Sequence, residues 1–283
     1  MKSEQRRGLL YVLLGAIAFS LGGLFVKLMP WSAMPVSGGR CIFSSIVIYL
    51  YIRFSGHKLR FNKTVLLGAV FVSAMLVCYV TSMKYTTAAN AIVLEYTAPI
   101  FIILFEALIF KKKPKKIDLI VSLLVFAGIL IVVSEGLGKG NLKGDLIALL
   151  SGVFYAFTIM LNDFEDGDPL SSVFLGHFMT IFIGLPSIVS ESDFSLPTLL
   201  LLAALGIFQA GAGYSLLTAG LRLCEPLADS LVASIEPVLN PILVAIFYKE
   251  YVSARTMLGA FIIIASIAFY NILSLKAAED EIK

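Results

Sequence analysis

Long apolar runs, separated by short polar segments, follow one another along the whole chain. A helix needs about 20 mostly apolar residues to cross a membrane. Ten segments meet this requirement: 8–28, 35–54, 64–83, 87–110, 116–134, 143–162, 170–189, 197–218, 226–248 and 253–274. The runs are continuously apolar and do not alternate, which excludes a transmembrane barrel. The pattern predicts an all-α polytopic membrane protein with ten transmembrane helices.

Composition agrees with this prediction. Hydrophobic residues make up 59% of the chain and charged residues only 14%, whereas soluble domains have about 45–50% and about 25%. The mean hydropathy is +0.93. The cysteines, Cys41, Cys78 and Cys224, lie in or beside apolar segments without metal or redox spacing. They are expected to be small buried side chains, and no metal and no cofactor are expected.

Two stretches of the chain look like copies of each other. Residues 91–111 (AIVLEYTAPIFIILFEALIFK) align without gaps on 229–249 (DSLVASIEPVLNPILVAIFYK), so that Pro99 falls on Pro237. The resemblance predicts two five-helix repeats, in residues 1–136 and 137–283. Because each repeat has an odd number of helices, the second copy is inverted, and a pseudo-two-fold axis in the membrane plane should relate the halves.

The basic residues predict the orientation. If the N-terminus is cytoplasmic, 15 of the 22 Lys and Arg residues fall in cytoplasmic segments and 5 in external ones, with Lys27 and Arg40 inside helices. Lys and Arg are enriched in cytoplasmic loops. The acidic loop 163–168 also lies inside, but acidic residues contribute little to this rule. We therefore expect a multi-pass protein of the cell membrane with both termini in the cytoplasm.

Proline interrupts the fourth helix of each repeat. Pro99 has no N–H, so the carbonyl of Glu95 loses its helical partner. Pro237 and Pro241 interrupt the ninth helix in the same way. Paired broken helices in the two halves of a membrane chain are the best sequence indication of a transporter's substrate site. The three prolines are therefore candidate gating residues.

Charged residues at membrane depth usually face a bundle interior or a wet cavity. Glu95 is suited to bind a cation or ammonium group; alternatively, it is a protonated glutamate bonded to a neighbouring helix. Arg40 is suited to bind a substrate carboxylate; alternatively, it snorkels or pairs with Glu95. Glu236 is either a binding or a structural residue, and it shares a helical face with Asp229, Ala233 and Asn240.

Other polar groups within the helices could line a cavity or serve as packing and interfacial residues. These candidates are Tyr79, Tyr96, Asn90, Tyr155, Gln209 and Tyr214. His177, the membrane-embedded histidine, is suited either to a proton relay or to a contact between helices.

With these repeats and motifs, the chain resembles the EamA-type branch of the drug/metabolite transporter superfamily. The resemblance rests on the doubled five-helix unit, on Arg40, on Lys84-Tyr85-Thr86, on LEYTAPIF (94–101), and on IEPVLNPI with Lys249-Glu250 (235–250). It implies a central cavity between the halves, lined mainly by the first four helices of each, and export or exchange of small metabolites. The first repeat departs from the family pattern, because Lys111-Lys112-Lys113-Pro114 stands where a Gly-Glu pair is common.

Other classes of protein fit the sequence less well. No HExxH motif, and no GxSxG in a strand-to-helix context, supports an intramembrane enzyme. Neither a selectivity filter nor a ring of charge supports a channel. No nucleotide-binding loop indicates direct use of ATP. Proton coupling through Glu95, exchange and facilitated diffusion all remain compatible with the sequence.

The sequence thus predicts a secondary transporter that exports amino acids or similar zwitterions by alternating access. The alternative is an efflux carrier for larger cationic or amphipathic drugs. The expected partners are a small-molecule substrate and the lipid bilayer, with no nucleic acid, and the expected state is a monomer or homodimer.

Overall fold

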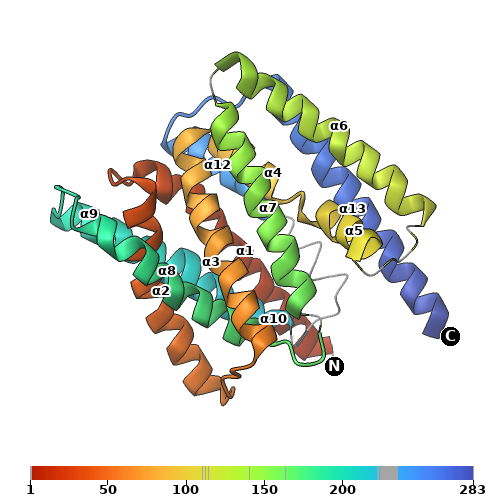
Figure 1. The fold of residues 1–283 in the computed structure, drawn as a ribbon, viewed down its shortest axis with the longest axis horizontal. Helices are drawn as coiled ribbons and strands as arrows, with labels where there is room; N and C mark the ends of the chain where they lie inside the picture. Colours follow the sequence, from red (N-terminus) through yellow and green to blue (C-terminus); the bar gives the residue numbers. More distant parts are fainter. Residues whose placement is uncertain are drawn as a thin grey trace.

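The computed structural model describes residues 2–109, 111, 113, 115–139, 141–162, 164–221, 223 and 235–282. All regular structure in these ranges is helical (Figure 1). The helices of the first half are α1 (Lys2–Leu28), α2 (Ala33–Ser55), α3 (Lys63–Tyr85), α4 (Ala88–Glu95), α5 (Ala98–Ile109) and α6 (Lys116–Lys139). Those of the second half are α7 (Leu142–Asn162), α8 (Pro169–Ile188), α9 (Leu196–Ala204), η1 (Leu205–Ala212), α10 (Gly213–Leu221), α12 (Glu236–Phe247) and α13 (Ala254–Ile282).

The all-α membrane prediction is confirmed. In the described part of the chain, eight segments are long and apolar enough to cross a membrane, and they correspond to the first eight predicted helices. Two shorter apolar helices, Glu236–Phe247 and Ala254–Tyr270, fall in the ninth and tenth predicted segments. The start of the ninth segment, at 226–234, lies outside the described residues.

The helices that carry the aligned prolines, α5 and α12, begin and end at aligned positions. On the alignment of 91–111 with 229–249, the first residues of α5 and α12 coincide, and so do their last residues. Each helix carries its proline at the second position. Lys111 and Lys249, which are aligned, both have a left-handed backbone, with φ of 53° and 58°. The repeat seen in the sequence is therefore also a repeat of local structure.

The predicted eighth helix, 197–218, is not a uniform α-helix. It begins as α9, continues as the π-helix η1 and ends as α10. π-helical segments inside α-helices often occur at functional sites. Here the π-helical turns carry Gln209, whose amide oxygen accepts a hydrogen bond from Arg40.

Contacts between the halves follow a reciprocal pattern. The second helix of one repeat, α2, packs on its counterpart α8, and the fifth, α6, packs on its counterpart α13. The contact of α1 with α10 has its reciprocal in α7 with α3, and the contact of α1 with α12 has its reciprocal in α7 with α4 and α5. A pattern that is unchanged when the two halves are exchanged is expected for halves related by a two-fold axis.

Glycine allows a close approach of the helices at two of these crossings. A Cβ added to Gly38 of α2 would lie 2.7 Å from Cα of Gly184 of α8. A Cβ on Gly128 of α6 would lie 3.0 Å from the carbonyl oxygen of Gly259 of α13. Small residues let membrane helices approach this closely, so both crossings depend on the absence of a side chain.

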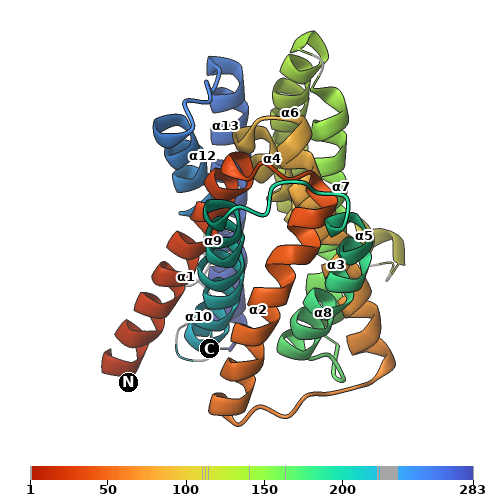
Figure 2. The same cartoon turned by 90° about the vertical axis from the view of Figure 1, so that its left-hand side faces the viewer.

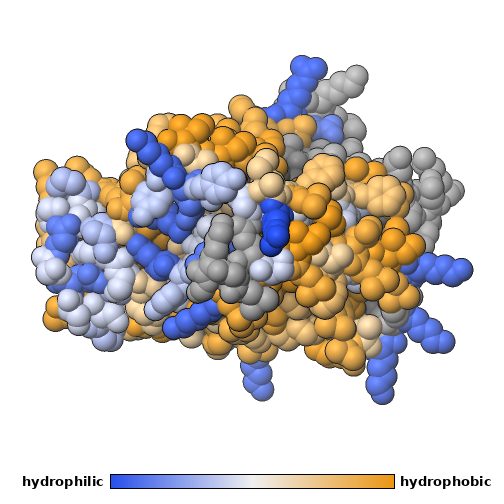
Figure 3. Space-filling model, turned by 90° about the horizontal axis from the view of Figure 1, so that it is seen from above, coloured by the Kyte–Doolittle hydropathy of each residue, from blue (hydrophilic) through white to orange (hydrophobic). Residues whose placement is uncertain are grey.

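The first helices of the two repeats run in opposite directions. Lys27, in the last turn of α1, contacts the connector that precedes α4, and Asp145, in the first turn of α7, contacts the same connector. We call this end of the bundle, where α1 ends and α4 and α7 begin, the α4 end. The described ends of the chain both lie at the opposite end (Figure 2). Seen from above, polar side chains cluster on one part of the face and hydrophobic ones flank it (Figure 3).

Candidate functional site

A cavity of about 110 Å³ lies between the two halves of the bundle. Its walls come from α1, α2, α3, the α4–α5 break, α7, η1, α10 and α12. The lining residues are Ala16, Phe19, Arg40, Met75, Leu76, Tyr79, Glu95, Tyr96, Tyr155, Gln209, Ala210, Tyr214, Leu217 and Glu236. Of the nine predicted binding residues, only Asn90 is absent from this lining.

Glu95 is the last residue of α4 and faces the cavity at the proline break. Its Oε2 lies 2.8 Å from Oγ of Ser151 on α7, which donates a hydrogen bond to it. Its carbonyl, which Pro99 cannot bond, lies against α7, because a Cβ on Gly152 would be only 3.0 Å from that oxygen. The break in one half therefore packs directly on the first helix of the other half.

Glu236 is the first residue of α12 and brings a second carboxylate to the cavity. Its Oε2 accepts a hydrogen bond of 2.8 Å from the hydroxyl of Tyr96, which follows Glu95 at the break. Each carboxylate is thus held by a hydroxyl from the opposite half. Because carboxylates at membrane depth are costly without partners, this arrangement keeps both acidic groups at the cavity wall.

Arg40 is buried on α2, with 1% of its surface exposed. Its Nη1 donates to Oε1 of Gln209 at 3.1 Å. Its Nε and Nη2 have no hydrogen-bond partner within the described part of the chain. Such deep burial does not fit a snorkelling arginine, and among the described residues no carboxylate lies within ion-pair distance of it. The pairing of Arg40 with Glu95 is therefore not seen.

Aromatic rings complete the wall. Tyr214 packs edge-on against Phe19 at 4.9 Å and against His177 at 5.2 Å between ring centroids. His177 is fully buried, its Nδ1 lies 2.9 Å from the carbonyl oxygen of Val173, and it does not line the cavity. These contacts favour helix packing over a proton relay for His177.

Asn90 lies away from the cavity, near the start of α4. Its amide nitrogen donates to Asp145 at 3.0 Å, and its amide oxygen accepts from Thr256 at 3.0 Å. These bonds tie α4 to α7 and α13. The structure therefore gives Asn90 a contact role between helices and does not bring it together with the other candidates.

The gating candidates lie beside the cavity and do not line it. Pro99 lies at the α4–α5 break, whereas Pro237 and Pro241 line a separate apolar groove of about 990 Å³. Ala89 and Val93 of α4, further residues of α12, the connector 249–252 and residues of α13 complete that groove. Because Glu236 and Pro237 are adjacent, α12 separates the cavity from the groove.

Sequence reasoning missed the role of some buried polar residues. Ser151 gave no signal, because serines are common in membrane helices. Asn240 was predicted to share a helical face with Glu236, Asp229 and Ala233. It is fully buried, and it lies so close to Gly23 that a Cβ added to Gly23 would overlap its amide oxygen. Two other residues of that predicted face, Asp229 and Ala233, lie outside the described residues.

Comparison with known proteins agrees with this architecture. The EamA-like transporter family matches residues 6–134 and again 142–272. The chain is thus a multi-pass membrane protein of transporter type. It belongs to the EamA-like transporter family, which confirms the resemblance drawn from the sequence.

Individual relatives share only part of their sequence with this chain. The chain is 27% identical over 285 residues to human solute carrier family 35 member G1, covering 92% of this chain and 77% of that protein. It is 28% identical over 204 residues to an uncharacterized transporter of Archaeoglobus fulgidus, covering 69% and 73%. A crystal structure with 16% sequence identity matches with a TM-score of 0.67 over 95% of this chain and 98% of its own, which supports the fold.

Proposed function

We propose that the protein is a secondary transporter that moves a small zwitterionic metabolite, such as an amino acid, across the cell membrane. The observation that carries this proposal is the cavity, which joins the buried guanidinium of Arg40 with the carboxylates of Glu95 and Glu236. Two nitrogens of Arg40, Nε and Nη2, have no protein hydrogen-bond partner among the described residues. A guanidinium matches the planar geometry of a carboxylate, and the glutamates suit an ammonium group.

The cavity volume favours a small substrate. Sites for drug-sized ligands are about 300–1,000 Å³, whereas this cavity measures about 110 Å³. One water needs only about 10–15 Å³ of such space, so a compact solute is compatible with it. The tyrosine hydroxyls around the wall add hydrogen-bonding groups that could orient such a solute.

Transport by alternating access is supported by the reciprocal contacts between the halves. In this proposal residues 1–136 and 137–283 form inverted repeats, and rocking of one repeat against the other exposes the cavity to each side in turn. Pro99, Pro237 and Pro241 allow the broken helices to change shape. Both termini are cytoplasmic, the direction is export, and Glu95 is the group that would carry a coupled proton.

The apolar groove favours the alternative function. Its volume of about 990 Å³ and its opening beside α12 and α13 would suit a larger cationic or amphipathic compound that enters from the membrane. On that reading, Lys249 and Glu250 are the charged residues that lie at the groove. The two functions predict different substrates and different contact residues.

Counterflow into proteoliposomes tests the proposal. Vesicles are loaded with an unlabelled amino acid, and uptake of its labelled form is followed for a panel of amino acids and for a cationic dye. We expect saturable, transient accumulation of at least one amino acid, and none in protein-free vesicles. Accumulation of the dye alone would favour the groove, and uptake without saturation or counterflow would indicate a channel.

A further inference from the structure

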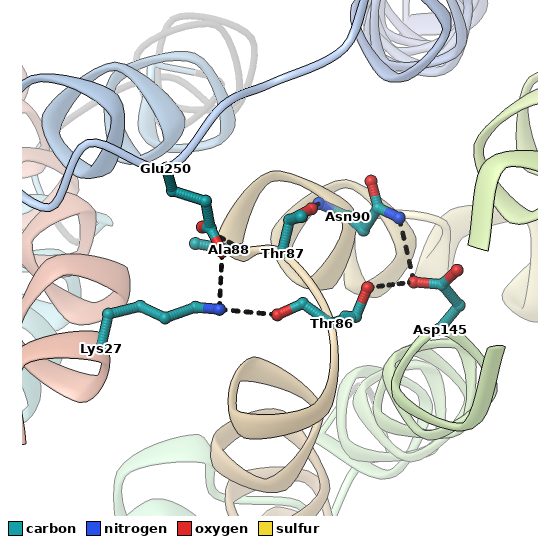
Figure 4. A network of polar contacts seen from close by, with 7 residues as sticks. All are labelled: Lys27, Thr86, Thr87, Ala88, Asn90, Asp145 and Glu250. Carbon is teal, nitrogen blue, oxygen red and sulfur yellow. Dashed lines mark hydrogen bonds and ion pairs between the residues drawn. The ribbon is translucent and has the colours of Figure 1, made fainter. Parts of the chain in front are cut away.

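An ion pair and a helix cap meet at the α4 end of the bundle (Figure 4). Nζ of Lys27 lies 2.8 Å from Oε1 of Glu250 and 2.7 Å from the carbonyl oxygen of Thr86. Oε2 of Glu250 accepts a hydrogen bond of 2.9 Å from the backbone N–H of Ala88, the first residue of α4. A carboxylate at this position is favoured because the first N–H groups of a helix lack intrahelical partners.

These contacts join the two halves. Lys27 and Ala88 belong to the first half, whereas Glu250 lies in the 248–253 connector between α12 and α13. The side chains of Lys27 and Glu250 are only 12% and 16% exposed. Salt screens charges shielded in this way far less than it screens exposed pairs. We call this contact between the two halves the link.

The link lies at the N-terminal end of helix α4, and the other end of this short helix, at Glu95, lines the cavity. Helix α4 has eight residues from Ala88 to Glu95, so its two ends are about 12 Å apart at 1.5 Å per residue. Between them, Asn240 is buried against Gly23. Asn240 is about one turn from Glu236, and Gly23 is about one turn from Lys27. Asn240 therefore lies between the cavity and the link.

The link has no acidic counterpart in the first repeat. On the alignment that places Lys111 on Lys249, the residue aligned with Glu250 is Lys112. The sequence therefore supplies a carboxylate at this aligned position to the second repeat alone. The two repeats thus differ at the position where the first repeat also lacks the Gly-Glu pair that is common in the family.

We propose that Lys27, Glu250 and the N-terminus of α4 form a latch that closes the pathway from the α4 end to the cavity. Opening requires Glu250 to leave both Lys27 and the N–H of Ala88, and this movement frees the end of α4 that is opposite Glu95. The proposal rests on alternating access, as described under the proposed function. The latch is a property of the protein itself and does not depend on which solute is carried.

Accessibility of a reporter cysteine tests the latch. In a background in which Cys41, Cys78 and Cys224 are replaced, Asn240→Cys is labelled with a membrane-impermeant maleimide added to one side of the vesicle at a time. With Glu250→Ala, which removes both contacts, we expect labelling from the α4 end to rise about tenfold, the usual size of a coupling between sites. Glu250→Gln, which keeps an oxygen for Ala88, should show a smaller rise.

Two further variants serve as controls. Lys249→Gln changes the exposed neighbour of Glu250, which takes no part in the latch, and should label like the parent. Exchanging the charges with Lys27→Glu and Glu250→Lys should return labelling part of the way, because the ion pair is restored but the cap is not. Labelling that stays unchanged in Glu250→Ala, rises equally in Lys249→Gln, or rises from the opposite side would overturn the proposal.

The result is separable from the proposed function because labelling needs no substrate. Unchanged labelling in Glu250→Ala together with amino-acid counterflow by the parent protein would reject the latch and retain the zwitterion transporter. Increased labelling without any amino-acid counterflow would retain the latch and reject the proposed substrate class.

Discussion

Replacing Arg40 with glutamine should separate substrate recognition from structure. If Arg40 binds the carboxylate of a zwitterion, Arg40→Gln should weaken transport of that substrate much more than transport of the matching amine, which lacks the carboxylate. If Arg40 is structural, both compounds should be affected alike. The comparison within one variant removes any general effect of the substitution on folding or insertion.

The magnitude follows from the two nitrogens of Arg40, Nε and Nη2, that lack a partner among the described residues and can each donate one hydrogen bond to a carboxylate. A hydrogen bond to a charged group contributes about 1.5–3 kcal/mol. Two such bonds at the lower value amount to about 3 kcal/mol, or about 100-fold in affinity at about 1.4 kcal/mol per factor of ten. The hydrogen bond from Nη1 to Gln209 adds nothing to this figure, because it does not involve substrate.

The assay is concentration-dependent counterflow in proteoliposomes, with the amino acid and its decarboxylated amine measured side by side. Arg53→Gln is the matched control, since Arg53 lies on the same helix but is exposed near its end. We expect the half-saturating concentration of the amino acid to rise about 100-fold in Arg40→Gln, that of the amine to change little, and Arg53→Gln to match the parent. Equal losses for acid and amine would refute the reasoning.

Four other outcomes are expected. Glu95→Gln should insert normally yet lose pH-dependent transport in a flux series across pH, whereas an unchanged profile would make Glu95 a packing residue. Pro99→Ala and Pro237→Ala should each restore a helical hydrogen bond and lower counterflow at normal expression; unchanged counterflow would make them tolerated kinks. Gly38→Val should overpack the α2–α8 crossing, costing about 1–3 kcal/mol and lowering the thermal midpoint in detergent. A reporter fused after Gly138 should report an external location, and a cytoplasmic signal there would contradict the inverted repeat.

Much of the fold follows from the sequence because membrane helices obey simple rules. About 20 apolar residues are needed to span the hydrocarbon core, and this length requirement identified the segments that form α1, α2, α3, α6, α7 and α8. The aligned prolines were expected to interrupt the fourth helix of each repeat, and α5 and α12 begin one residue before Pro99 and Pro237. These signals are local, so a single sequence was sufficient to find them.

The cavity could be predicted in part. Glu95, Arg40 and Glu236 were found because charge at membrane depth needs an interior partner, and all three line the cavity. Asn90 has the same polarity but bonds Asp145 and Thr256. Polarity shows that a side chain avoids lipid, and it does not show whether a cavity or another helix receives it.

Other features depend on tertiary packing and left no local signal. Ser151 matters because α7 places its hydroxyl beside Glu95, and nothing in its own segment indicates that contact. The π-helix that carries Gln209 to Arg40 was also missed, since hydropathy fits an ordinary helix there equally well. The partners of Lys27 come from residues far along the chain, so sequence alone gave no indication of them.

The central claim is that the cavity binds a zwitterion by both of its charged groups. The most direct measurement is a structure of the protein with an amino acid that it has been found to carry in counterflow. We predict density for the ligand in the cavity, with its carboxylate at Nε and Nη2 of Arg40 and its ammonium group between Glu95 and Glu236. Density in the apolar groove between α4, α12 and α13, or a cavity that stays empty of ligand at saturating concentration, would contradict the account.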